Sequence, residues 1–279
     1  MTALRAALAR ATERLTVAGV PSPRVDAEEL AAHSLGVSRR DLWGHDDPGD
    51  EFDSYVGRRA AREPLQHITG QAHFRHLTLA VGPGVFVPRP ETEVVVEAAL
   101  VAARSAPSPR VVDLGTGSGA IALAVATELP RATVHAVEAD PAAHAWAVRN
   151  CAGSSVDLRL GDMAAAFDDL DGTVDVVVSN PPYIPVGASV RDPEVAQFDP
   201  SMALWSGSDG LDAVRTVEQV AARLLRPGGT VVVEHADLQG VSAPAVFLSS
   251  GRWIDVVDHR DLAGRDRYLT ATRTPSSAQ

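Results

Sequence analysis

The short stretch Asn180-Pro181-Pro182-Tyr183 combines residue types that suit an amino group. It follows the mainly apolar residues 174–178, which predict a buried parallel strand. Proline has no N–H to donate, so the strand must end here. The Asn180 side-chain oxygen and the Pro181 carbonyl would then form a pair of acceptors for a planar –NH2 group. A plain loop after a strand is the alternative, since Asn and Pro are common turn residues.

A glycine-rich turn, Gly115-Thr116-Gly117-Ser118-Gly119, follows a second predicted strand at residues 111–114. Glycines let the backbone approach a ligand closely at the N-terminus of the helix that follows. The third glycine comes one place earlier than in the dinucleotide fingerprint. Turns of this kind serve nicotinamide, flavin and S-adenosylmethionine sites alike, so this turn alone does not identify the ligand.

Two acidic residues follow the next two predicted strands. Glu138 ends residues 133–138, about 20 residues after the glycine turn, where an acid binds ribose hydroxyls. Asp162 follows residues 156–160, in a position to meet an adenine amino group. A solvated strand end is the usual fate of a lone carboxylate. Suitable residue types at three consecutive strand ends favour a nucleoside-binding site.

Arg89 lies between two prolines, Pro88 and Pro90. This predicts an extended backbone with a free guanidinium, which is a reasonable carboxylate clamp. A capped linker explains the same segment equally well.

Alternating strands and helices must position these groups. Such βα units predict a parallel sheet with right-handed crossovers. The expected strands are residues 111–114, 133–138, 156–160, 174–178, 230–235, 253–258 and 267–272. The expected helices between them are residues 93–104, 120–128, 141–150, 209–225 and 239–248.

The first 62 residues predict a small helical bundle instead. Leu4, Leu8 and Leu15 share one helix face, and Asp26 is expected to cap a helix that stops at Gly36. Residues 72–81 alternate as a hairpin would. We expect no regular structure from residue 275 onward.

Bulk composition excludes several classes of protein. The chain has 279 residues, 45% of them hydrophobic and 22% charged, as in an ordinary globular protein. A net charge of −11 disfavours a nucleic-acid partner. The single cysteine, Cys151, excludes a disulfide framework, and we expect no metal site. Without an apolar run of about 18 residues or a signal peptide, we expect a cytoplasmic protein with no membrane partner.

The two turns together resemble class I S-adenosylmethionine-dependent methyltransferases that act on an NH2 nitrogen. With Phe86-Val87-Pro88-Arg89-Pro90-Glu91-Thr92-Glu93 upstream, the chain resembles the release factor glutamine methyltransferases, the HemK/PrmC family. Residues 63–70, Phe198-Asp199-Pro200 and residues 261–267 fit that family too. The resemblance covers about residues 63–273. Glu138 stands where the family often has Asp, which keeps an acceptor there.

This resemblance implies an α/β fold with a Rossmann-like, seven-stranded, mostly parallel sheet. The expected domains are residues 1–69 (helical, substrate recognition), 70–87 (hairpin linker) and 88–279 (methyltransferase). It also implies N5-methylation of the glutamine in the Gly-Gly-Gln motif of peptide-chain release factors, converting S-adenosylmethionine to S-adenosylhomocysteine. Asn180 and the Pro181 carbonyl would orient the glutamine, with Pro182 and Tyr183 against its side chain. The expected cofactor residues are Phe86, Arg89, Gly115, Thr116, Gly117, Ser118, Gly119, Glu138, Asp162, Met163 and Asn180.

Three other functions are compatible with the same predicted pocket. A nucleic-acid methyltransferase (adenine N6 or guanine N2) would flip its base into the site, but the negative charge disfavours it. A ribosomal-protein glutamine methyltransferase differs only in its substrate-facing surface. A cofactor-binding scaffold has no need of Asn180-Pro181-Pro182-Tyr183. We expect release factors as partners, no direct nucleic acid, and a monomer.

Overall fold

The computed structural model describes residues 3–190 and 192–275, and these form two compact units. The smaller unit contains the chain up to Gln71, Val81–Pro83 and Val190–Phe198. The larger unit contains Ala72–Ala80, Gly84–Ser189 and the chain from Asp199 onward. Within the described ranges, no helix combines the length and apolar character needed to cross a membrane. Beyond position 275, the tail that we predicted to lack regular structure lies outside the described residues.

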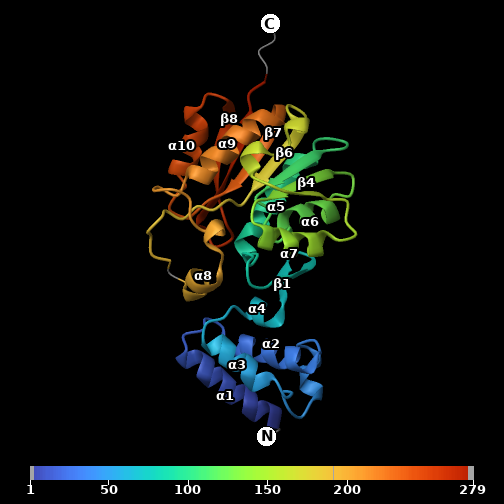
Figure 1. Cartoon of the computed structure of the whole chain (residues 1–279), viewed down its shortest axis with the longest axis vertical. Coiled ribbons are helices and arrows are strands. Elements are labelled where there is room, and N and C mark those ends of the chain that lie inside the picture. The colour runs from blue at the N-terminus through green and yellow to red at the C-terminus, as the bar shows by residue number, and fades with distance from the viewer. Residues whose placement is uncertain (1–2, 191, 276–279) are drawn as a thin grey trace. The chain divides into compact units, whose positions relative to one another are not determined.

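A seven-stranded sheet forms the centre of the larger unit, in the order β5-β4-β3-β6-β7-β9-β8 (Figure 1). The first four pairings along this order are parallel, and β9 runs antiparallel to both β7 and β8. The predicted Rossmann-like, mostly parallel sheet is therefore confirmed. The strands are β3 (Arg110–Leu114), β4 (Thr133–Glu138), β5 (Asp157–Leu160), β6 (Val174–Ser179), β7 (Leu225–Glu234), β8 (Trp253–Arg260) and β9 (Asp266–Arg273).

Helices cover both faces of this sheet (Figure 1). Successive strand residues point to opposite faces, so Val176 and Val178 pack with α5 and α6, while Val177 packs with α9. This is why the central strands are apolar on both faces. The helices of the unit are α5 (Glu93–Ala103), α6 (Ala120–Glu128), α7 (Pro141–Cys151), α9 (Asp212–Leu224) and α10 (Ser242–Ser249). The short 3-10 turns are η2 (Pro90–Thr92), η3 (Met163–Ala165), η4 (Asp168–Leu170) and η5 (Ser201–Ala203).

Most predicted elements are confirmed within a few residues, but the boundary between α9 and β7 is not where we predicted it. The helix ends at Leu224, and β7 begins at Leu225 instead of residue 230. Pro227 therefore lies within the strand, beside a register shift between Val174 and Val176 of β6. A proline is compatible with a strand at such an irregularity because no ladder hydrogen bond is required there.

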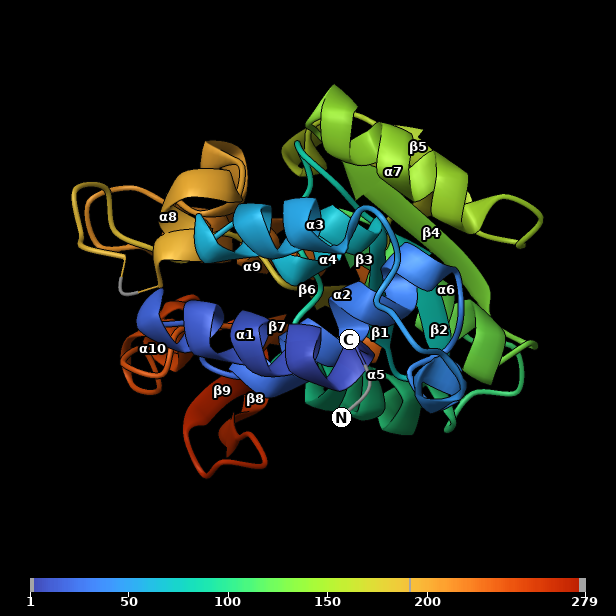
Figure 2. The same ribbon diagram turned by 90° about the horizontal axis from the view of Figure 1, so that it is seen from below.

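Helices α1 (Ala3–Val17), α2 (Pro23–Leu35) and α3 (Phe52–Ala60) form the body of the smaller unit and lie side by side (Figure 2). Their core contains Leu4, Leu15 and Phe52, which confirms the predicted bundle. The remaining elements of this unit are η1 (Asp41–Gly44), α4 (Leu65–Thr69) and α8 (Pro193–Phe198).

The prediction that Asp26 caps the second helix is wrong. The helix begins earlier, at Pro23, whose fixed φ and missing N–H suit the first helical position. Asp26 is buried inside α2 and accepts a 2.7 Å hydrogen bond from Arg59 Nε. The predicted stop is confirmed, because Gly36 ends the helix with a φ of 67°.

The predicted hairpin is also present, as β1 (Gln71–Phe74) paired with β2 (Leu77–Ala80). Asn150 of α7 fixes β2, accepting from the Ala80 N–H at 2.8 Å and donating to its carbonyl at 3.0 Å. The hairpin strands are thereby tied to the helices of the larger unit.

Candidate active site

The two turns that could do chemistry begin side by side. Strands β3 and β6 are neighbours, with Asp113 opposite Val178, and the Ser179 hydroxyl donates to the Leu114 carbonyl at 2.6 Å. The chain order reverses at this pair, since β4 and β5 lie on one side and β7 on the other. Ligands of open α/β sheets bind at such a switch point, outside the carboxyl ends of the strands.

The glycine turn after β3 leaves open space for a ligand. Gly115, Gly117 and Gly119 have φ values of 73°, 57° and 84°, a region that other residues rarely adopt. A Cβ at Gly115 or Gly117 would meet no atom within 4 Å, whereas one at Gly119 would lie 3.0 Å from Cys151 Sγ. The first two glycines therefore border free space, and the third allows close packing against α7. This arrangement fits the close approach of a cofactor.

Asp113 holds this turn against the start of α6. Its carboxylate accepts from the Thr116 hydroxyl at 2.6 Å and from the Ala122 N–H at 3.1 Å. The side chain is fully buried, and burial raises the pKa of Asp113 to about 7 against the pull of these two donors. Asp113 therefore fixes the turn from the buried side, and the Thr116 hydroxyl is occupied by its hydrogen bond to Asp113.

Glu138 and Asp162 lie at adjacent strand ends, as predicted. Glu138 accepts from the Gly117 N–H at 2.8 Å and from the Asp140 N–H at 2.9 Å. Its carbonyl accepts from the Gly161 N–H at 2.9 Å, which places Asp162 beside it. Each carboxylate oxygen can accept more than one hydrogen bond, and each Glu138 oxygen accepts one here, so Glu138 retains capacity for a ligand.

Asp162 is exposed and accepts from the Ala164 N–H at 2.9 Å, while Met163 opens η3 against the core. The proposed contacts of Glu138, Asp162 and Met163 with a cofactor stay predictions.

The expectation of a free Arg89 guanidinium is wrong. Arg89 Nη2 donates to Asp199 Oδ2 at 2.9 Å, and its guanidinium carbon lies 5.0 Å from the centre of the Phe86 ring. The Asp199 side chain is 1% exposed. Arg89 is thus a carboxylate clamp, but for a carboxylate of its own chain. The expected part of Phe86 and Arg89 in closing a cofactor pocket stays a prediction.

Asn180, Thr92 and Glu234 come from separate segments and lie together. Asn180 Nδ2 donates to the Thr92 hydroxyl at 3.1 Å, and both residues act as hydrogen-bond donors to the carboxylate of Glu234. Thr92 is 4% exposed and Glu234 2% exposed, while Asn180 is half-buried. Burial raises the pKa of Glu234 to about 7, although Thr92, Asn180 and the nearby Arg267 lower it in part.

The backbone of Tyr183 is fixed by Gln239. Gln239 Nε2 donates to the Tyr183 carbonyl at 3.1 Å and to the Gly210 carbonyl at 3.3 Å. A Cβ on Gly210 would come within 2.4 Å of the Tyr183 carbonyl oxygen, so this position accepts only glycine. The Tyr183 side chain is half-buried, and burial raises the pKa of its phenol.

Four residues around the site are not among the site residues predicted from sequence, namely Thr92, Asp199, Glu234 and Gln239. Glu234 carried a usable signal, since it is an acid that ends an apolar strand, as Glu138 does. Thr92 belongs to the segment that carries the family resemblance, but the sequence predicts no site role for it. It lies 88 residues from Asn180, a pairing that the linear order does not reveal.

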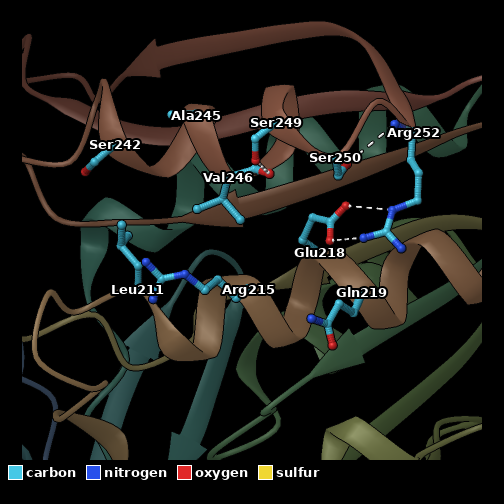
Figure 3. Close-up of a pocket in the computed structure, with 10 residues that line it drawn as sticks. All are labelled: Leu211, Arg215, Glu218, Gln219, Ser242, Ala245, Val246, Ser249, Ser250 and Arg252. Carbon is cyan, nitrogen blue, oxygen red and sulfur yellow. Dashed lines mark hydrogen bonds and ion pairs between the residues drawn. The ribbon is translucent and has the colours of Figure 1, made fainter.

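A separate pocket of about 430 Å³ lies between α9 and α10 (Figure 3). The 2.6 Å ion pair between Glu218 and Arg252 occupies one end of it. None of the predicted site residues lines this pocket. It is therefore distinct from the candidate site at the sheet edge.

Two family models match the chain, "PrmC N-terminal domain" at residues 6–70 and "Methyltransferase small domain" at residues 77–196. Among solved structures, a methyltransferase from Pyrococcus furiosus aligns with a TM-score of 0.49 and 18% identity, over 70% of this chain and 88% of that one.

Curated relatives match over nearly the whole chain. A release factor glutamine methyltransferase from Streptomyces coelicolor is 57% identical over 98% of this chain and 99% of its own length. A 4-amino-L-phenylalanine/4-methylamino-L-phenylalanine methyltransferase from Streptomyces pristinaespiralis is 43% identical over 99% of this chain and 97% of its own. The former similarity and the match to both family models lead to one conclusion: the chain belongs to the release factor glutamine methyltransferases.

Proposed function

We propose that this chain methylates the side-chain nitrogen of the glutamine in the Gly-Gly-Gln motif of peptide-chain release factors. As a member of its family it is a methyltransferase with S-adenosylmethionine as cofactor. Bound S-adenosylmethionine supplies a methyl group on a positively charged sulfur. The residues of this chain then have to bind the cofactor and orient the acceptor nitrogen.

A carboxamide nitrogen is a poor nucleophile because its lone pair is delocalised into the carbonyl. Holding its two N–H groups on Asn180 Oδ1 and the Pro181 carbonyl would aim the nitrogen and favour its pyramidalisation. Orientation of this kind is worth several kcal/mol, up to about 7–11 for ideal alignment. No strong base is required before attack, since the N-alkylated amide becomes acidic and loses its proton readily.

The orientation of Asn180 is the observation that carries this proposal. The Nδ2 end is turned inward to Thr92 and Glu234, which leaves Oδ1 as the free acceptor beside the glycine turn. Tyr183, fixed through its carbonyl, is the residue we assign to packing on the glutamine side chain. Pro182 would line the same contact.

We assign the cofactor to the edge of the sheet from β3 to β5. Gly115, Gly117 and the intervening Thr116 backbone would approach it, with Ser118 and Gly119 completing the turn. Glu138 would accept from the ribose hydroxyls and Asp162 from the adenine amino group. Burial at the turn and open space over its glycines support this assignment.

The direct test is methyl transfer from labelled S-adenosylmethionine to purified release factor. The control is a release factor whose motif glutamine is changed to alanine. We expect label on the wild-type factor alone, located on that glutamine by mass spectrometry. Equal labelling of both factors, or of neither, would contradict the proposal.

The arylamine relative justifies a second acceptor in the same assay. That relative is 43% identical to this chain and is named as a methyltransferase of 4-amino-L-phenylalanine, which carries a different kind of amino group. We expect 4-amino-L-phenylalanine to be inert here. Methylation of it, of ribosomal protein or of nucleic acid in place of the release factor would keep the pocket chemistry and change the substrate.

The remaining parts of the proposal follow from this substrate. Release factors act in translation, so the enzyme would work in the cytoplasm. Residues 1–69 would help to recognise the factor, and residues 88–279 would perform the transfer. We also expect a monomer, which light scattering after gel filtration would check.

A further inference from the structure

We propose that Thr92 and Glu234 are positioning residues that fix the amide of Asn180 with its oxygen toward the acceptor. Both are buried, and neither is close to Asn180 in sequence. This inference rests on the proposed function, because it explains how Asn180 becomes the acceptor that orients an –NH2 group.

The argument begins with what each group can donate. An asparagine amide has two nearly isosteric ends, one that only donates and one that only accepts. An ionised carboxylate has no hydrogen to give, so only the Nδ2 end of Asn180 can face Glu234. The Thr92 hydroxyl accepts from Nδ2 at 3.1 Å and gives its own hydrogen to Glu234. Both hydrogens of the amide are thereby directed inward.

Burial makes this selection strong. A flipped amide would place Oδ1 against the carboxylate, two acceptors facing each other at a site shielded from water. One Glu234 oxygen, Oε2, has no hydrogen-bond partner within the described chain, so the carboxylate depends on the donors it has. An unpartnered buried polar group is costly, and losing a further donor adds to that cost.

The surroundings of Glu234 determine how it responds to pH. Arg267 of β9 favours its ionised form, while Glu91 of η2 disfavours it, and Tyr183 lies close enough to feel its charge. Burial raises the pKa of Glu234 to about 7. Protonation would turn the carboxyl into a donor and remove the reason for the amide to keep one orientation.

The chain offers a clean spectroscopic test, because asparagine occurs only at positions 150 and 180. Selective ¹⁵N labelling of asparagine side chains therefore gives two NH2 groups, and Asn180→Asp identifies one of them. Asn150 is an internal control, since its Nδ2 donates to the carbonyls of Ala80 and Ser118 and to no carboxylate.

In the ligand-free protein we expect the chemical shifts of the Asn180 NH2 group to change as the pH passes through about 7, while those of Asn150 stay nearly constant. Glu234→Gln, which keeps the size of the side chain, abolishes that change. A stationary Asn180 signal in the wild type, or a movement that persists in Glu234→Gln, would overturn the inference.

Kinetics provide the second readout. Thr92→Val removes the hydroxyl but keeps the shape, and we expect kcat to fall about 10-fold with little change in the Kd of S-adenosylhomocysteine. Thr92→Ser should restore most of that loss, because the hydroxyl returns. An unchanged kcat in Thr92→Val, or equal losses in Val and Ser variants, would argue against positioning.

These results separate the two proposals. If the wild-type protein fails to methylate release factor but the Asn180 signal behaves as expected, the substrate is wrong and the positioning stands. If release factor is methylated but the signal does not respond to pH, the positioning is wrong and the function stands.

Discussion

The turn after β3 and the turn after β6 begin side by side, but they are built in different ways. Asp113 holds the first turn through partners only 3 and 9 residues away, and Glu138 reaches it from 21 residues away. The second turn depends on partners at 56, 65 and 88 residues, namely Gln239, Leu114 and Thr92.

This difference matches what each turn must do. The glycine turn presents backbone N–H groups and open space, and local φ values are enough to define that geometry. The Asn-Pro-Pro-Tyr turn presents one side-chain oxygen in one orientation. An amide can rotate, so its orientation has to be imposed by partners that the neighbouring sequence does not contain.

The same dependence on distant residues continues beyond the second turn. Glu194, in α8, accepts from Arg59 at 2.7 Å and from Arg62, residues more than 130 positions earlier. Asp26 accepts from the other side of Arg59, so the guanidinium lies between two buried carboxylates. All four residues belong to the smaller unit.

The largest expected effect comes from breaking this ion pair. Glu194→Ala leaves Arg59 buried with one partner fewer, which should cost about 3–5 kcal/mol of unfolding free energy. Equilibrium urea unfolding would measure it. Asp209→Ala is the control, because the ion pair of Asp209 with Arg215 is exposed and should contribute only about 0–1 kcal/mol. Equal losses of unfolding free energy in the two variants would mean that the buried ion pair stabilises the fold no more than the exposed one.

Acid should weaken the same contact. Burial alone would raise the pKa of Glu194, but hydrogen bonds from Arg62 and Arg59 outweigh it and lower the pKa from 4.5 to about 2. The folded state therefore binds fewer protons than the unfolded state in this window. The stabilisation is complete above pH 4.5 and is lost as the pH falls through about 2.

Comparing the unfolding free energy of the wild type with that of Glu194→Gln across this range isolates the contribution. The difference between them should shrink steadily as the pH falls. A constant difference would show that Glu194 is not held in its ionised form.

Next in size is the turn after β6 itself. Asn180→Ala removes the orienting acceptor and should lower kcat by roughly 10²- to 10³-fold, comparable to the loss of one preorganised polar group in other active sites. Affinity for S-adenosylhomocysteine, measured by calorimetry, should fall much less than kcat, even though Asn180 is also among the expected cofactor residues. Pro181→Ala keeps its carbonyl and should lose far less. Wild-type turnover in Asn180→Ala would exclude the orienting role.

The smallest effect is expected at the glycine turn. Gly117→Ala puts a Cβ into the open space and a strained φ of 57° on alanine, so S-adenosylmethionine should bind about 10-fold more weakly. Gly153→Ala is a matched control, with a φ of 80°, no atom within 4 Å, and a position in the turn after α7. Equal cofactor affinity in both variants would mean that Gly117 does not face the ligand.

Much of the fold follows from local sequence. The strand at residues 133–138 and the helix at 120–128 were predicted with their observed ends, because apolar periodicity, Gly119 and Pro130 mark them clearly. Predictions failed where a distant partner decided the outcome. Asp26 looked like a cap but serves Arg59, and Arg89 looked free but binds Asp199.

The sequence by itself determined the sheet, the two turns and the chemical types that meet at its edge. Glycine and proline set the backbone conformation locally, through the φ angles that they allow. A run of valines favours a strand that is buried on both faces of a parallel sheet. The tertiary structure alone decided which way Asn180 faces. Its amide takes its orientation from Thr92 and Glu234, which reach it only after the chain has folded, because hydrogen bonds act over about 3 Å of space whatever the distance along the chain.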